Sequence, residues 1–439
     1  MEAPSLSTIA SSAPAPCPAR SHEPDLAERF RSVRRRTLEI VEPLTPEDMM
    51  VQSCAEASPA KWHLAHTAWF FESFILREFL PGYQVFNPDF IWLFNSYYQT
   101  FAAFPEKRLR SSFSRPALHE ILAYRRHVDE AIDRLLAQGA PPEALKRIEL
   151  GTNHEEQHQE LLLTDILNAF FTNPLRPAYR PDGSPGEEPA SPVPLAFTSY
   201  TGGLCDVGHS GDSFCFDNEM PRHRVWLEPY ALADRLVTSG EYARFIADSG
   251  YRRSELWLSA GWDAVQREGW RAPLYWTERD GAWSLFTLRG ERPLSQVSAA
   301  PVSHVSFFEA DAYARWAGLR LPTEFEWEAA TEGLPIDGNL LESGELAPSA
   351  ATGLVQSEGG AKRQWWGDCW EWTASAYLGY PGFQPLPGSL GEYNGKFMSG
   401  QMVLRGGSCV TPAPHIRATY RNFFSPETRW QFSGIRLAK

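Results

Sequence analysis

Apolar residues recur at helical spacing along the first part of the chain. One segment places its apolar side chains on a single helical face: Leu118, Ile121, Leu122, Val128, Ile132 and Leu135. Similar patterns predict four helices, over residues 25–41, 58–80, 117–136 and 142–171. Four helices joined by long connections predict a bundle, a fold whose core can hold a metal site.

The pattern changes at about residue 197, after which the chain is rich in Gly, Trp and turn residues with short strand-like runs. Three helices are predicted in this second half, over 239–249, over 306–317 and from Thr323 onward. Thr323 and Glu326 have the spacing of a capping box, which marks a helix N-terminus. The second half is therefore predicted to be a separate, mixed domain.

These patterns divide the chain into four parts. Residues 1–23 are rich in Ala, Ser and Pro and have little charge. We expect a disordered tail without the features of a secretory signal. Residues 24–175 form the predicted bundle, and 176–195 are dense in proline, which indicates a linker. Residues 196–439 form the second domain.

Charge and cysteine content narrow the functional classes. Asp and Glu total 54 against 41 Lys and Arg, a net charge of −13, which disfavours binding to a nucleic-acid backbone. We found no continuous apolar run of about 18 residues, so a membrane span is not expected. The six cysteines are scattered and lack a CxxC pair, which argues against a disulfide framework or a zinc finger. We expect a cytoplasmic protein.

Histidines give the strongest chemical signal. His154 and His158 are four residues apart on the predicted fourth helix, a spacing that allows both imidazoles to bind one metal ion. His63 and His66 lie on the predicted second helix, and either could complete a three-histidine set, because they are only about 60° apart around the helix. Imidazole ligands suit iron, zinc and copper alike.

The histidines also allow two other interpretations, a zinc peptidase and a non-catalytic module. Residues 154–158 also match the HExxH pattern of zinc peptidases, which would make Glu155 the catalytic base. Leu161 and Thr164 occupy positions where a metzincin has glycine and histidine. Alternatively, the histidines are solvent-facing and the chain is a non-catalytic binding module.

Several strings resemble a known family. Residues 61–67 (KWHLAHT) and 154–158 (HEEQH) resemble the DinB-like helical domain of the sulfoxide synthases of ergothioneine biosynthesis. The second half contains strings similar to the formylglycine-generating-enzyme fold, a variant of the C-type lectin fold: PVSHVS (301–306), LPTEFEWE (321–328), WEWT (370–373), LRGGS (404–408) and GIRL (434–437). The resemblance implies an α+β chain with a DinB-like four-helix bundle first and a lectin-like domain second.

The same resemblance implies a reaction. Family members use Fe(II) and O2 to join the sulfur of cysteine, or of γ-glutamylcysteine, to C2 of the imidazole of hercynine, which is Nα-trimethylhistidine. The implied iron ligands are His66, His154 and His158. Formylglycine-generating enzymes have a reactive cysteine pair after the RGGS string, but here Cys409 stands without a partner. The second domain is thus expected to be a substrate-binding wall without that oxidase chemistry.

Further residues are expected to meet the substrates. Tyr97 and Tyr98 are candidates for the proton and electron donor, although both could be packing aromatics. Gln157 is expected to hydrogen-bond the imidazole or the carboxylate of hercynine, and Asn422 to meet its carboxylate or ammonium region. Phe423 and Phe424 are expected to be walls around the trimethylammonium group, since aromatic faces bind such cations, although core packing would explain both rings equally well. Arg108 or Arg110 is expected to bind the thiol carboxylate. The tyrosine pair and the Phe423–Phe424 pair resemble the branch that uses free cysteine. The sequence leaves the oligomeric state open.

Overall fold

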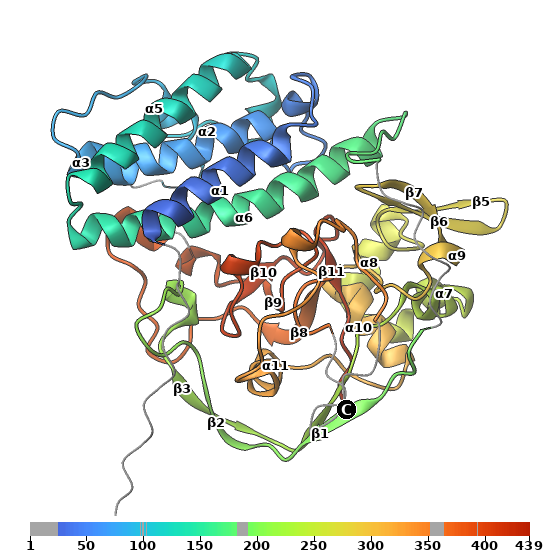
Figure 1. Cartoon of the computed structure of the whole chain (residues 1–439). Coiled ribbons are helices and arrows are strands. Elements are labelled where there is room, and N and C mark those ends of the chain that lie inside the picture. The colour runs from blue at the N-terminus through green and yellow to red at the C-terminus, as the bar shows by residue number, and fades with distance from the viewer. Residues whose placement is uncertain are drawn as a thin grey trace, which may run out of the picture.

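The computed structural model describes residues 25–96, 98, 101, 103–181, 192–351, 364–392 and 394–439. The predicted N-terminal tail, Tyr97 and the middle of the predicted linker lie outside these residues. Figure 1 shows helices gathered in one layer and a second part, containing the strands, packed beneath them. This architecture confirms the α+β fold expected from the sequence.

The helical layer consists of four long helices that lie side by side (Figure 1). They are α1 (Leu26–Val41), α2 (Ala60–Phe71), α5 (Leu118–Ala137) and α6 (Pro142–Thr172). Their positions match the four predicted helices closely, because each has a strong apolar periodicity or an evident start signal. The second helix begins slightly later than expected, with Pro59 as its N-cap.

Short helical segments extend or connect these four. A π-helical turn, η2 (Glu72–Leu76), follows α2 directly and leads into α3 (Arg77–Phe79). Two further segments lie between α3 and α5, namely α4 (Phe90–Leu93) and the 3-10 helix η3 (Lys107–Ser112). None of the helices among the described residues has the length and apolar character that crossing a bilayer would require.

Helix α6 lies between the two domains, with α1 and α2 on one side and the second domain on the other (Figure 1). Side chains along α6 form hydrogen bonds to residues far along the chain: Asn153 to His415, Gln157 to Tyr420, Glu160 to Trp370, Asp165 to Trp430 and Asn168 to Tyr275. Helix α6 is therefore buried on two faces. The polar side chains on its face toward the second domain bond to residues of that domain, whereas on a surface helix they would face water.

The second domain is built on a four-stranded sheet in the order β10–β9–β8–β11, in which β11 is parallel to β8. Two two-stranded sheets, β1–β4 and β2–β3, and a three-stranded sheet, β5–β6–β7, surround it. The strands are β1 (Phe197–Tyr200), β2 (Gly203–Val207), β3 (His223–Leu227), β4 (Tyr230–Ala233), β5 (Trp276–Arg279), β6 (Ala282–Thr287), β7 (Gly290–Pro293), β8 (Trp370–Ala376), β9 (Met402–Arg405), β10 (Asn422–Phe424) and β11 (Ser433–Gly434).

The three predicted helices of this domain are present as α7 (Ser239–Ala247), α10 (Phe307–Trp316) and α11 (Glu324–Thr331). The expected capping box exists: Glu326 N donates to Thr323 Oγ1 at 3.1 Å, and Thr323 N donates to the Glu326 carboxylate at 2.7 Å. Sequence patterns missed α8 (Ser259–Glu268) and α9 (Leu294–Val297).

The LRGGS string begins within β9 and continues beyond its end as part of the buried core. Arg405 is fully buried and donates to Glu324 and Glu328 of α11, each at 2.9 Å. The following Gly406 has φ +98°, and a Cβ there would lie 2.8 Å from the carbonyl oxygen of Trp365. Glycine is therefore required at this position for conformation and for space.

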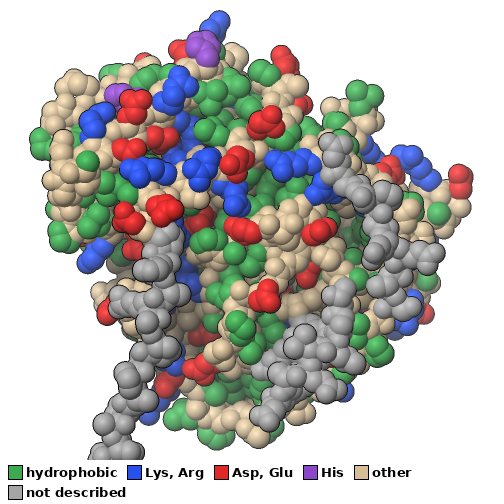
Figure 2. Space-filling view, viewed as in Figure 1, with side chains coloured by type: hydrophobic (Ala, Val, Ile, Leu, Met, Phe, Trp, Pro, Cys, Tyr) green, Lys and Arg blue, Asp and Glu red, His purple; other side chains and the backbone are tan. Residues whose placement is uncertain are grey.

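On the face drawn in Figure 2, acidic and basic side chains are intermixed over the helical domain. The net negative charge of the chain is thus not concentrated on this face.

Candidate metal centre and substrate cavity

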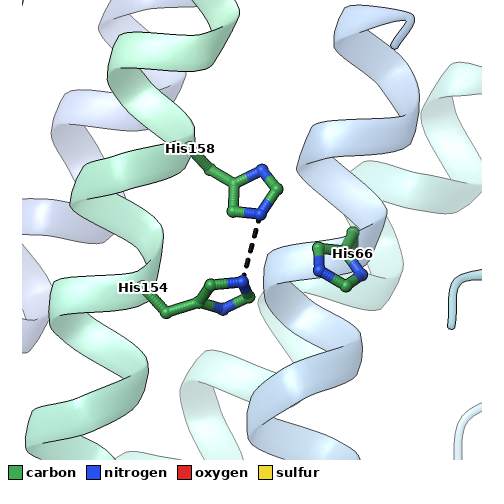
Figure 3. A group of neighbouring side chains, drawn as sticks. All are labelled: His66, His154 and His158. Carbon is green, nitrogen blue, oxygen red and sulfur yellow. Dashed lines mark hydrogen bonds between the residues drawn. The ribbon is translucent and has the colours of Figure 1, made fainter. Parts of the chain in front are cut away.

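Three imidazoles converge where α2 faces α6 (Figure 3). His154 and His158 are one turn apart on α6, and His66 reaches them from α2. One ring nitrogen from each lies within 4.8 Å of the others, and all three side chains are buried. The set could therefore hold a metal ion.

His66 is held by its surroundings before any ion binds. Its ring is stacked between two indoles, with centroid distances of 4.5 Å to Trp62 and 5.3 Å to Trp69 and interplanar angles of 12° and 15°. Its Nδ1–H donates to the carbonyl oxygen of Phe94 at 2.7 Å. Because Nδ1 is used in this way, the Nε2 lone pair is available for a metal ion.

All three imidazoles are held in the neutral form. Burial lowers the pKa of His154 to about 3. Burial, followed by the neighbouring imidazole of His154, lowers the pKa of both His66 and His158 well below the usual value. Neutral imidazole is the form that binds metal ions, so the environment favours ligation over protonation.

The spacing of the ring nitrogens also fits a metal ion. Two nitrogens that bind one ion at about 2.0–2.1 Å and at a right angle lie about 3 Å apart. The Nε2 atoms of His154 and His158 are 3.1 Å apart (Figure 3). The three residues thus fit a metal ion in both position and charge state.

Glu155 excludes the zinc-peptidase interpretation of residues 154–158. Its carboxylate is fully buried and accepts hydrogen bonds from Arg34 at 2.7 Å, Arg125 at 2.8 Å and Thr37 at 2.6 Å. Burial alone would raise the pKa of Glu155, but the two guanidinium groups and these hydrogen bonds lower it to about 2. A carboxylate with so low a pKa and with these three donors is a poor general base for a bound water. Glu155 is instead part of the ion-pair network in the core of the bundle.

His63, the other histidine of the KWHLAHT string, is in contact with His158 and lines the same cavity. Its Nδ1 is 2.7 Å from Nδ1 of His158, and its Nε2 is 3.1 Å from the carboxylate of Asp165. The helix periodicity could not separate His63 from His66, and the structure brings His66 into the convergent set. Sequence analysis missed Asp165, although it follows His158 by seven residues and so shares its helix face.

A cavity of about 300 Å³ adjoins the centre. It lies where α6 meets the second domain, and His154 and His158 form part of its wall. Five residues that were expected to meet the substrates also line it: Arg110, Gln157, Asn422, Phe423 and Phe424. The structure thus brings together residues that are up to 314 positions apart in the sequence.

Gln157 is oriented by a tyrosine of the second domain. Its Nε2 donates to the hydroxyl oxygen of Tyr420 at 2.7 Å, and that hydroxyl is 3.0 Å from Nε2 of His415. Burial lowers the pKa of His415 well below the usual value, so the imidazole is neutral and can accept a hydrogen bond from the Tyr420 hydroxyl. The amide nitrogen of Gln157 is thereby engaged, which favours its oxygen as the group offered to a ligand. No local sequence signal pointed to Tyr420.

The aromatic wall of the cavity is itself supported by ring contacts. Phe423 is stacked on Tyr377, with centroids 4.0 Å apart and an interplanar angle of 9°. Phe424 meets Trp430 edge-on at 5.3 Å, and Trp430 also lines the cavity. These contacts hold both phenyl rings in place, and Trp430 adds a third aromatic face that the sequence analysis did not anticipate.

The two candidate arginines have different environments. The side chain of Arg108 is 72% exposed and paired with Glu106, and it is not among the described residues that line the cavity. Arg110 lines the cavity, donates to Ser58 Oγ at 2.8 Å, and has its Cζ 3.5 Å from the Trp62 ring centroid. Lys107, one turn earlier in η3, also lines the cavity and was missed.

The positive charge of Arg110 is buried. Burial lowers its pKa to about 9, with Asp165 acting in the opposite direction. A carboxylate bound beside Arg110 would relieve the cost of burying this charge. The cavity thus has a basic end formed by Arg110 and Lys107 and an aromatic end formed by Phe423, Phe424 and Trp430.

The tyrosine pair is only partly described. Tyr97 lies outside the described residues. Tyr98 is fully buried, with its ring 5.6 Å from that of Trp69 and 5.1 Å from that of Phe74. Trp69 in turn stacks on His66, so a single indole contacts both Tyr98 and one of the three candidate metal ligands.

Comparison with known proteins agrees with both halves of this structure. Residues 29–163 match the family model of the DinB superfamily, and residues 188–439 match that of the sulfatase-modifying factor enzyme 1-like domain. Hercynine oxygenase of Mycolicibacterium thermoresistibile is 32% identical over 95% of this chain and 95% of its own length. Those of Mycolicibacterium smegmatis and Mycobacterium tuberculosis are each 32% identical over 94% of this chain and 98% of their own lengths.

These matches follow the domain order expected from the sequence. They exclude the non-catalytic binding module, because the three hercynine oxygenases match 94–95% of this chain. The chain belongs to the hercynine oxygenase family.

Proposed function

We propose that this protein is an Fe(II)-dependent sulfoxide synthase that joins the sulfur of cysteine to C2 of the hercynine imidazole. The central observation is the neutral three-histidine set opening on a cavity with a basic end and an aromatic end. The reaction balances as thiol plus imidazole C–H plus O2 giving the sulfoxide and one water. Iron, when bound, supplies the redox chemistry that lets O2 react with the two organic substrates.

His66, His154 and His158 are the proposed iron ligands. Three neutral donors on one side would leave the opposite side accessible from the cavity, where O2 and the thiol can enter. The indoles on both faces of His66 and its hydrogen bond to Phe94 support a centre that is organised in advance. Little rearrangement would then be needed when iron binds.

Hercynine is proposed to bind between α6 and the second domain. Its imidazole N–H would donate to Oε1 of Gln157, whose amide nitrogen is engaged by Tyr420. Its trimethylammonium group has no proton to donate and would lie against the faces of Phe423 and Phe424. Asn422, which lines the same cavity, would donate to the hercynine carboxylate.

Cysteine is proposed to bind at the basic end. Its carboxylate would meet Arg110, which already has a fixed position on Trp62, and Lys107 would add a second positive charge. Phe424 occupies the position where dipeptide-using members of the family tend to have an acidic residue for the extra ammonium group. Phe424 packs against Trp430 and offers that ammonium group no carboxylate, and this supports cysteine over γ-glutamylcysteine.

Tyr97 and Tyr98 are the proposed source of a proton and an electron. A phenol can give both, which would direct turnover to C–S bond formation instead of simple oxidation of the thiol. The proposal is supported by the position of Tyr98 against Trp69, which stacks on His66. We further propose a cytoplasmic location, since the five described cysteines are free thiols, as expected in a reducing compartment.

A thiol competition experiment tests the substrate assignment. The Fe(II)-loaded protein is given hercynine, O2 and equal concentrations of cysteine and γ-glutamylcysteine, and the two sulfoxides are quantified by mass spectrometry. We expect the cysteine product to predominate by at least tenfold. Predominance of the dipeptide product would overturn the assignment. Phe424→Asp is expected to shift the ratio toward the dipeptide, because it introduces the carboxylate that the ammonium group requires.

A further inference from the structure

His63 is a buried imidazole with no task in the proposed reaction, yet both of its ring nitrogens have partners. Nδ1 is 2.7 Å from Nδ1 of His158, and Nε2 is 3.1 Å from Oδ2 of Asp165. His63 is 2% exposed and Asp165 is 7% exposed. The three side chains form a row of hydrogen bonds from a carboxylate to one member of the convergent histidine set.

The hydrogen positions in this row follow from the carboxylate. An ionised carboxylate can only accept, so Nε2 of His63 must provide the hydrogen to Asp165. With both imidazoles neutral, Nδ1 of His63 is then without a hydrogen and accepts from Nδ1–H of His158. This leaves Nε2 of His158 with its lone pair, facing Nε2 of His154 at 3.1 Å.

The carboxylate that starts the row is itself fixed from two sides. The backbone N–H of Ser58, just before α2, donates to Oδ2 of Asp165 at 2.8 Å. The indole Nε1–H of Trp430, from the second domain, donates to Oδ1 at 3.0 Å. Both oxygens are therefore occupied by donors, so Asp165 is held as an acceptor toward His63.

We propose that Asp165 and His63 are positioning residues that keep His158 in its Nδ1–H tautomer and thereby set the affinity of the centre for its metal ion. Metal-binding imidazoles usually donate their second N–H directly to a carboxylate, a carbonyl or water, and loss of that partner typically weakens metal binding 10–100-fold. Here an additional imidazole stands between the ligand and the carboxylate. The inference rests on the ligand set of the proposed function.

Paired variants at position 63 test the metal-binding consequence. His63→Leu removes the acceptor for His158, whereas His63→Gln can still accept through its amide oxygen. Affinity for Co(II) is measured on the full chain by competition with a chelator. We expect roughly 10–100-fold weaker binding in His63→Leu and recovery of most of that loss in His63→Gln. His119→Leu, which removes an exposed histidine on α5, is the matched control and should bind as the unmodified protein does.

Nuclear magnetic resonance of the metal-free protein tests the tautomer directly. With ¹⁵N-labelled histidine, we expect His158 of the unmodified chain to have its hydrogen on Nδ1, and a mixture of tautomers to form in His63→Leu. Finding Nε2–H at His158 in the unmodified protein would overturn the proposal, and this measurement does not depend on any variant folding.

The ligand set and the positioning role of His63 can be tested separately. If His158→Ala binds Co(II) as tightly as the unmodified chain, the ligand set, and with it the proposed function, is wrong. If His158→Ala loses binding but His63→Leu retains full affinity, the ligand set stands and the positioning role of His63 is wrong.

Discussion

At the scale of single residues, the centre combines features that the sequence could and could not predict. The pairing of His154 with His158 was predictable because their spacing on one helix is a local property. The choice of His66 over His63 did not follow from the helix periodicity and came only from the family resemblance, because it depends on how packing rotates α2 against α6. In the structure, Trp62 and Trp69 enclose His66 and settle that rotation.

Arg110 is expected to set the affinity for the thiol substrate. Arg110→Leu removes a charged hydrogen-bond donor, which is worth about 1.5–3 kcal/mol, so the KM for cysteine should rise roughly 10–100-fold. Steady-state kinetics with cysteine varied and hercynine saturating measure this effect. Arg108→Leu is the control, since Arg108 is exposed and pairs with Glu106, and its KM should stay within about twofold. An unchanged KM in Arg110→Leu would remove Arg110 from the site.

The tyrosine pair is expected to control which product forms. Replacing Tyr97 and Tyr98 by phenylalanine, singly and together, removes the hydroxyl groups that would give the proton and electron. We expect product to shift from the sulfoxide to cysteine sulfinic acid, measured by mass spectrometry of both. Tyr124→Phe, another fully buried tyrosine whose hydroxyl is bound to Glu72, should leave the ratio unchanged. A constant ratio in the double variant would contradict the donor assignment.

At the scale of elements, the sequence predicted what depends on nearby residues. The four long helices and the capping box at Thr323 follow from apolar spacing and from contacts three residues apart. The π-helical turn η2 was not predicted, because it lies inside a continuous apolar helix pattern. Helices α8 and α9 were also missed, since they lie among turn-rich stretches and begin after Leu258 and Pro293, which provide no capping side chain.

Gly151 illustrates how closely α6 packs against α2. A Cβ at this position would lie 2.7 Å from Cε1 of Phe71 and 3.1 Å from Cδ1 of Phe70. Gly151→Ala should gain about 1 kcal/mol of helix propensity but lose about 1–3 kcal/mol through overpacking. We therefore expect a lower Tm by calorimetry.

The control for this change makes room for the added methyl group. In a Phe71→Leu background, adding Gly151→Ala should leave Tm unchanged or raise it, because the closer of the two rings, that of Phe71, is gone. A rise in Tm for Gly151→Ala in the unmodified chain would show that the helices can separate to accept it.

At the scale of the whole molecule, the cavity beside the metal centre is formed where the two domains meet. The sequence and its family resemblance gave the nature and order of the domains. They could not show that Tyr420 would contact Gln157, or Trp430 Asp165, because these pairs are 263 and 265 residues apart. Contacts of this kind depend on how two finished domains pack, a property without a local signal.

Asp368 is expected to make the free energy of unfolding depend on pH. It is 4% exposed, and burial raises its pKa to about 6 despite hydrogen bonds from Ser349 and Asn339. The native state then holds the proton more tightly than the unfolded state, so the free energy of unfolding falls as pH rises from about 4 to about 6. At about 1.4 kcal/mol for each pKa unit, the loss is about 2–3 kcal/mol.

Asp368→Asn removes this titration while retaining an oxygen acceptor. Denaturant unfolding at a series of pH values should show the variant gaining stability relative to the unmodified protein between pH 4 and 6, with a constant difference above about pH 7. A difference that does not change with pH would show that Asp368 titrates normally in the folded protein.

The most direct test of the central claim is the product of a single defined reaction. The purified chain is loaded anaerobically with Fe(II), supplied with hercynine and cysteine, and then exposed to O2, and the products are identified by mass spectrometry. We expect hercynyl cysteine sulfoxide, formed only when Fe(II) and O2 are both present and lost in His154→Ala. Absence of this sulfoxide, with γ-glutamylcysteine also giving no coupled product, would contradict the account.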